Sequence, residues 1–330
     1  MRFEKLFARR KLLMGAAIVM VFLYHSKGLW PESPVKTVAS FFYGAVDIFF
    51  FASGVGCWFS YTDRRSTADW FRRRARRILP VYLPFILVWL LLMARRGQWS
   101  ILMTAGNLLS VQWLIDPDTA FNWYVTGLWL SYLLTPLLAR LAAWAKGPAR
   151  GALVTAALLA LSVTCWGHHS LIIIAARLPI FFIGLWFAAE SRRREALTRW
   201  ETVLSLALIP VGVALLWRWA GRYPDLLWDR ALYWYPFLLI VPGGVILAAS
   251  LADALDCSAV GRAATGAFAW LGGCTFEIYL VHLALEGSGW GVYVFGTALG
   301  AAALHLAAKG LLSLCRPRLR EAAASDGTGR

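Results

Sequence analysis

The stretch VMVFLYHSK, Val19 to Lys27, ends an apolar run with a single ionisable ring, that of His25. The run covers residues 12–28, close to the ~20 helical residues that cross a hydrocarbon core. An ionisable group inside a membrane is expensive, so it usually faces a protein interior or a water-filled cavity. The stretch therefore predicts a first membrane-spanning helix that carries a polar site near one end.

The composition of the whole chain is typical of a membrane protein. Of its 330 residues, 59% are hydrophobic and 15% are charged, against roughly 25% charged in ordinary soluble domains. We expect an all-α polytopic integral membrane protein, with one membrane domain over residues 1–320 and a disordered cytoplasmic tail over residues 321–330. Apolar stretches predict about ten spans, over residues 12–28, 41–61, 78–94, 121–141, 151–166, 171–189, 202–219, 231–252, 264–285 and 290–313.

The net charge of +15 is explained by topology rather than by nucleic-acid binding. Most lysines and arginines fall in segments that share one side of the membrane if the N-terminus is cytoplasmic, and this asymmetry places both termini inside. We therefore expect a multi-pass protein of the cytoplasmic membrane, with the lipid bilayer as a partner and no nucleic acid. The five cysteines have no metal-ligand spacing, so we expect buried thiols and no metal.

Five ionisable residues of four predicted spans fall in the half of the membrane that faces outside. At ~1.5 Å per residue, His25 lies about 21 Å above the cytoplasmic edge, and Asp47 and Arg177 lie about 9 Å below the outer surface. His282 lies about 5 Å below that surface, with Glu277 deeper on the same helix. This shared depth favours a site open to the outside. The alternative is a buried ion pair between Asp47 and Arg177, with both histidines in a wet interface.

Six segments, spread from the first predicted span to the ninth, carry a family resemblance. Because these segments follow one another in the family's order, the chain resembles the integral-membrane acyltransferase family 3. Members of this family transfer acyl groups, mostly acetyl, to extracytoplasmic sugars. The segments are LYH (Leu23–His25), GAVDIFFFASG (Gly44–Gly54), FRRRARRILPVY (Phe71–Tyr82), NWYVTGLWLSYLLTP (Asn122–Pro136), RLPIFFIG (Arg177–Gly184) and TFEIYLVH (Thr275–His282).

The resemblance implies roles for the residues of the outer layer. The first-span histidine, here His25, is held to be the catalytic base or the acyl-accepting group, and Asp47 of the GVDIFF-like motif supports the same site. An imidazole can take the proton from a sugar hydroxyl that attacks a thioester, and a carboxylate can fix its tautomer. Arg177 is then a candidate for binding the oxyanion or a sugar carboxylate. His282 is a second candidate for proton transfer.

Further candidates complete the predicted binding sites. Trp123 opens the fourth span on the outer side and is expected to stack on a sugar ring, and Glu277 is a further candidate for binding substrate. An arginine run faces the cytoplasm, where it marks the inside and contacts lipid headgroups. The same guanidinium groups can bind the phosphates of coenzyme A, so acetyl-CoA or another acyl-CoA is the expected donor. The run consists of Arg72, Arg73, Arg74, Arg76 and Arg77.

One position departs from the family pattern. Members usually carry an arginine eleven positions before the histidine, where this chain has Met14. Arg10 or Lys11, about one helical turn earlier, can reach the same place. Otherwise recognition of the donor or catalytic competence is affected.

The sequence therefore predicts an O-acetyltransferase that moves an acyl group from cytoplasmic acyl-CoA to a sugar hydroxyl of an envelope polysaccharide or its precursor. A path between Arg76 and His25 is expected. Two alternatives use the same residues differently. One is a transporter or flippase for a lipid-linked or small anionic molecule, in which the polar layer binds the cargo. The other is a catalytically inactive membrane relative.

Overall fold

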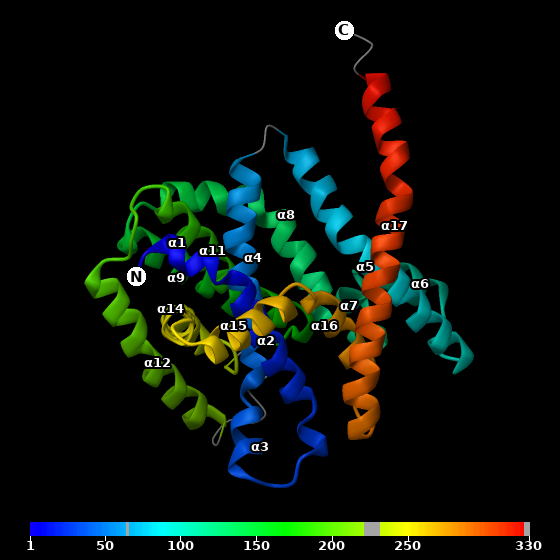
Figure 1. Ribbon diagram of the computed structural model, residues 1–330, viewed down its shortest axis with the longest axis horizontal. Helices are drawn as coiled ribbons and strands as arrows, with labels where there is room; N and C mark the ends of the chain where they lie inside the picture. Colours follow the sequence, from blue (N-terminus) through cyan, green and yellow to red (C-terminus); the bar gives the residue numbers. More distant parts are fainter. Residues whose placement is uncertain (64–65, 221–231, 327–330) are drawn as a thin grey trace.

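The computed structural model describes residues 1–63, 66–220 and 232–326, and every element in these ranges is helical (Figure 1). The longer helices are α2 (Arg10–His25), α4 (Ala45–Thr62), α5 (Thr67–Arg95), α8 (Trp123–Trp144), α9 (Pro148–Val163), α11 (Leu178–Ser191), α12 (Arg199–Ala220), α14 (Phe237–Leu255), α15 (Ala259–Leu271), α16 (Thr275–Ala284) and α17 (Thr297–Asp326). The shorter ones are α1 (Phe3–Ala8), η1 (Lys27–Leu29), α3 (Pro34–Ala39), η2 (Phe42–Gly44), α6 (Ile101–Leu108), α7 (Gln112–Ile115), η3 (Pro117–Thr119), α10 (His169–Ala175) and η4 (Val292–Gly296).

The described helices are those of a polytopic membrane protein. Seven of them are long and apolar enough to cross a membrane, or up to eight if one bent pair counts as a single span. These helices differ in how much of their apolar stretch is buried inside the protein. The buried share is 78% in the α10–α11 segment, but only 11% in α12 and 22% in the span that contains α17. Because α12 and α17 lie at opposite edges of the molecule (Figure 1), their exposed apolar faces are the ones expected to contact lipid. The count of ten spans stays a prediction.

The predicted disordered tail, residues 321–330, overlaps the last residues of α17. This helix continues to Asp326, so residues 321–326 are helical. Residues 327–330 lie outside the described ranges, and the disorder predicted there stays a prediction.

The predicted span over residues 264–285 is bent rather than straight. Its two halves, α15 and α16, meet at an angle of 69°. The bend lies where α15 crosses α2 at glycines: a Cβ at Gly15 would overlap the carbonyl oxygen of Phe268, and one at Gly272 would overlap that of Lys11. Small residues let helix backbones approach this closely inside a membrane. The crossing places the start of α16 beside the N-terminal half of α2.

The crossing of α4 and α11 positions two of the predicted site residues. A Cβ at Gly54 would overlap the carbonyl oxygen of Phe181, and one at Gly184 would overlap that of Phe51. Asp47 and Arg177 each precede the crossing glycine of their own helix by seven residues. Both side chains therefore stand about 10 Å from the crossing point at a rise of 1.5 Å per residue. Two helices that run in parallel through this contact bring the carboxylate and the guanidinium together.

Replacing Gly184 by alanine is expected to destabilise the protein by about 1–3 kcal/mol, because the added methyl group forces two backbones apart. The measurement is thermal or denaturant unfolding of the purified protein in detergent. Gly244→Ala on α14 is the matched control, since a Cβ there meets no atom within 4 Å and alanine favours a helix over glycine. An unchanged stability of Gly184→Ala would contradict the tight crossing.

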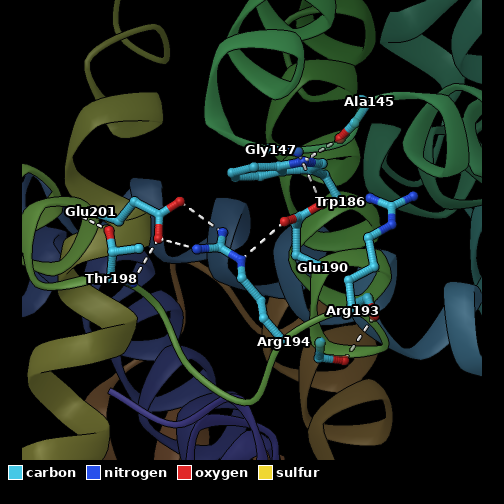
Figure 2. A network of polar contacts seen from close by, with 10 residues as sticks. Ala145, Gly147, Trp186, Glu190, Arg193, Arg194, Thr198 and Glu201 are labelled. Atoms are coloured by element: carbon cyan, nitrogen blue, oxygen red, sulfur yellow. Dashed lines mark hydrogen bonds and ion pairs between the residues drawn. The ribbon is translucent and has the colours of Figure 1, made fainter.

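A polar network joins the C-terminal end of α11 to the starts of α9 and α12 (Figure 2). The buried carboxylate of Glu190, near the end of α11, accepts hydrogen bonds from Gly147 N at 3.2 Å, Arg193 at 2.5 Å and Arg194 at 3.0 Å. Arg194 also pairs with Glu201 at the start of α12 at 2.5 Å. A buried carboxylate with several donors is well satisfied. The network therefore anchors α11, which carries Arg177 at its other end.

Candidate active site

His25 ends α2, and two groups from the segment after the α15–α16 bend lie against its ring. Nδ1 of His25 lies 2.9 Å from Oε2 of Glu286, although the ring is not turned for an aligned hydrogen bond. The ring of His282 lies 5.1 Å away between centroids, at 65°. His25 is half-buried, with 20% of its side chain exposed. An imidazole next to a carboxylate and open to one side has the surroundings of a general base.

His282 is fully buried on α16 behind His25. Its Nδ1 lies 2.9 Å from the carbonyl oxygen of Ile278, so Nδ1 carries the proton and donates it, and Nε2 keeps a lone pair. Among the described residues, Nε2 of His282 has no hydrogen-bond partner. A buried unpaired acceptor beside a second imidazole fits the predicted role in proton transfer, which stays a prediction.

Asp47 and Arg177 form a buried pair, the arrangement that the sequence left as the alternative to an open site, with 2% and 1% of their side chains exposed. Nε of Arg177 lies 3.7 Å from Oδ1 of Asp47, too long for a hydrogen bond. The guanidinium lies between the rings of Trp123 at 4.7 Å and Trp234 at 4.1 Å, and it donates to the carbonyl oxygen of Ile173 at 3.0 Å. Two aromatic faces stabilise a desolvated cation. Trp123 therefore contacts Arg177, and its predicted stacking on a sugar stays a prediction.

A small cavity, here called the outer pocket, lies between His25 and Arg177. It has a volume of about 140 Å³ and is lined by His25, Tyr43, Trp123, Arg177 and Tyr279 together with neighbouring apolar side chains. The structure thus brings the histidine of the first predicted span and the arginine of the sixth to one cavity. Cation, imidazole and aromatic walls together suit a polar ligand with an apolar face, such as a sugar.

A second cavity, here called the basic pocket, lies at the other end of α2. It has a volume of about 200 Å³, and Arg10, Arg74, Arg77, Met14 and Glu277 are among the residues that line it. Arg10 and His25 begin and end α2, which separates them by about 22 Å along the helix axis. The two pockets therefore occupy opposite ends of the same helix.

The structure divides the arginine run into two groups. Arg74 and Arg77 line the basic pocket, whereas Arg72, Arg73 and Arg76 are exposed and are not part of its lining. Positions three residues apart share a helix face, which explains why Arg74 and Arg77 point the same way. Arg74 is also fixed by hydrogen bonds to Gly56 O, at 2.9 Å, and to the hydroxyl of Ser60.

The structure places Glu277 in the basic pocket rather than in the outer pocket. Glu277 precedes His282 by five residues, or about 7.5 Å of helix, which is enough to move it to the other cavity. Oε1 of Glu277 lies 2.8 Å from Nδ1 of His305 on α17. No local pattern in the sequence indicates this pair, because the two residues lie 28 positions apart.

Tyr279 lines both pockets. Its ring is buried, 4.6 Å from the ring of Tyr124 and 5.5 Å from that of His282. The predicted path from the arginines to His25 thus meets an aromatic side chain between two cavities. Arg77, not Arg76, lines its basic end.

A family model described as an acyltransferase domain matches residues 12–314. The chain belongs to acyltransferase family 3. No curated protein and no solved structure matches it. The match begins within α2 and ends within α17, and it includes every lining residue of the two pockets except Arg10. The protein is therefore a membrane acyltransferase.

Two residues that line or approach the pockets of this acyltransferase differ from what the family pattern predicts. Met14 lines the basic pocket together with Arg10, so Arg10 supplies a guanidinium one turn before the position where the family usually has an arginine. Glu286 was not among the residues singled out from the sequence, because it lies beyond the end of the last predicted site helix. No helical spacing marked it, because Glu286 also lies beyond the end of α16 at Ala284.

Proposed function

We propose that the protein is an O-acyltransferase of the cytoplasmic membrane that moves an acetyl or other short acyl group from acyl-CoA to a sugar hydroxyl of an envelope glycan or its precursor. The observation that carries the proposal is the position of Tyr279 between a pocket with three arginines and a pocket with His25. With ten spans and both termini inside, the arginines face the cytoplasm and His25 faces outside.

The residues of the basic pocket fit an acyl-CoA donor. Arg77 is exposed at this pocket and is available to the coenzyme phosphates. Nε of Arg10 is buried with no hydrogen-bond partner among the described residues, and a guanidinium in this state suits an anion or a carbonyl oxygen. The nucleotide would remain at the mouth of the pocket, while the narrow pantetheine arm extends toward Tyr279.

The reaction balances without a metal or redox partner. The sugar oxygen attacks the thioester carbonyl carbon while His25 takes the hydroxyl proton. The C–S bond then breaks, and the coenzyme thiolate leaves and receives the proton from the imidazolium. Arg177 stands in the outer pocket, where a cation stabilises developing negative charge on an oxyanion. The products are the O-acyl sugar and free coenzyme A.

Replacing Arg77 by alanine is expected to raise KM for acetyl-CoA about tenfold, because a charge-assisted hydrogen bond to phosphate contributes about 1.5–3 kcal/mol. The assay is release of free coenzyme A by the purified protein in lipid nanodiscs, where water replaces the sugar. Arg76→Ala is the matched control and is expected to change KM less than about twofold. Equal effects of both variants would contradict the assignment of the donor site. Counterflow of a labelled sugar without any coenzyme A release would instead favour a transporter.

A further inference from the structure

The segment between α16 and η4 carries Glu286 and is fastened to the end of α2 on both sides of His25. The hydroxyl of Tyr293 donates to the carbonyl oxygen of Phe22 at 2.9 Å, and Nε1 of Trp290 donates to that of Leu29 at 3.0 Å. These bonds join residues 271 and 261 positions apart in the chain. They hold the segment in register with the last turn of α2.

Aromatic packing reinforces the same attachment. The rings of Phe22 and Tyr293 lie 4.4 Å apart, and those of Trp30 and Trp290 lie 6.0 Å apart. Such pairs contribute beyond the area that they bury. The position of the Glu286 carboxylate at His25 Nδ1 therefore follows from a built contact between two segments rather than from a free loop.

We propose that Glu286 is the positioning carboxylate of His25, an assignment that rests on the proposed acyltransferase function. Asp47, the carboxylate expected there from the sequence, lies against Arg177 instead. A carboxylate that accepts the Nδ1 proton keeps Nε2 as the basic nitrogen and stabilises the imidazolium that forms during transfer. The 2.9 Å contact becomes an aligned hydrogen bond when the ring turns toward a bound acceptor hydroxyl.

Among the charged and titratable groups around His25, Glu286 is the one suited to accept the Nδ1 proton. His282 donates its Nδ1 proton to the main chain, Arg177 and Tyr43 face His25 from across the outer pocket, and Lys27 lies over the ring of Tyr24 at 3.9 Å. None of these side chains can accept a proton from Nδ1 and also carry a compensating negative charge at neutral pH.

The test compares Glu286→Ala and Glu286→Gln with wild type in the coenzyme A release assay. We expect kcat to fall about 100-fold for Glu286→Ala and about tenfold for Glu286→Gln, whose amide oxygen still accepts the Nδ1 proton but carries no charge. KM for acetyl-CoA is expected to stay within about twofold, because the donor binds at the other end of α2. Added formate is expected to restore part of the kcat of Glu286→Ala but not that of Glu286→Gln, where no space is left.

The matched control is Glu32→Gln, an exposed glutamate that pairs with Lys36 and is expected to leave kcat unchanged. Wild-type kcat in both Glu286 variants, together with an inactive His25→Ala, would overturn the assignment while leaving the acyltransferase function intact. Equal losses in both variants with no formate rescue would show a structural role and would also overturn it. Full activity of His25→Ala would instead count against the proposed function itself.

Discussion

His25→Ala is expected to lower the rate of coenzyme A release by about 10²–10⁴-fold, the usual contribution of a general base. No other described side chain combines an imidazole, a contact with a carboxylate and a place in the outer pocket. His282 cannot simply replace it, because that ring is fully buried and is absent from the lining of the outer pocket. The measurement is the initial rate in nanodiscs at saturating acetyl-CoA.

The control for His25→Ala is His168→Ala, which removes an exposed histidine at the N-cap of α10 whose side chain makes no cap hydrogen bond. Both variants are expected to unfold at the wild-type temperature, because His25 is half-buried and its loss leaves no unpaired charge in the interior. Binding of acetyl-CoA is expected to persist in His25→Ala, since the basic pocket is intact. No coenzyme A release from either protein would instead fit the inactive relative considered from the sequence, or a transporter. A His25→Ala protein that releases coenzyme A at the wild-type rate would contradict the role of His25 as the base.

The site could be predicted from the sequence only where a residue's depth in the membrane determined its position. His25 and His282 were placed in one layer by a constant helix rise, and their rings lie 5.1 Å apart. The rise alone did not show that Glu277, five residues before His282, lines the basic pocket rather than the outer pocket, nor that a bend of 69° precedes α16. Bends of this kind depend on which backbone lies opposite a glycine, and that is a property of the packed helices rather than of local sequence.

The division of the arginine run shows what helix periodicity adds. Arg74, Arg77, Ile78 and Val81 all line the basic pocket, and their spacing of three, four and seven residues is that of a single helix face. The helical spacing therefore indicated which arginines share the pocket face, whereas the charge, which is the same for all five, did not. Glu286 is the opposite case, since the hydrogen bonds that hold its segment join residues more than 260 positions apart and no local pattern encodes them.

Replacing Arg177 by methionine is expected to destabilise the protein by about 3–5 kcal/mol, because it leaves the buried Asp47 carboxylate without its cation. It also removes the contacts with the rings of Trp123 and Trp234. The measurement is the free energy of unfolding in detergent, compared with that of the double variant Asp47→Asn/Arg177→Met. The double variant is expected to recover most of the loss, since removing both charges of a buried pair by groups of similar size is often close to neutral.

The double variant also distinguishes the two interpretations that the sequence left open, a buried ion pair that serves packing and a pair that belongs to the functional site. If the pair served packing alone, a stable double variant would retain its activity. We expect a folded protein with less than about 1% of wild-type coenzyme A release, in keeping with the loss of a preorganised charge at a reacting oxygen. The geometry favours this result: Arg177 lines the outer pocket with His25, and Oδ2 of Asp47 is buried with no hydrogen-bond partner among the described residues. A carboxylate held for packing normally has both oxygens satisfied, whereas one that awaits a ligand does not.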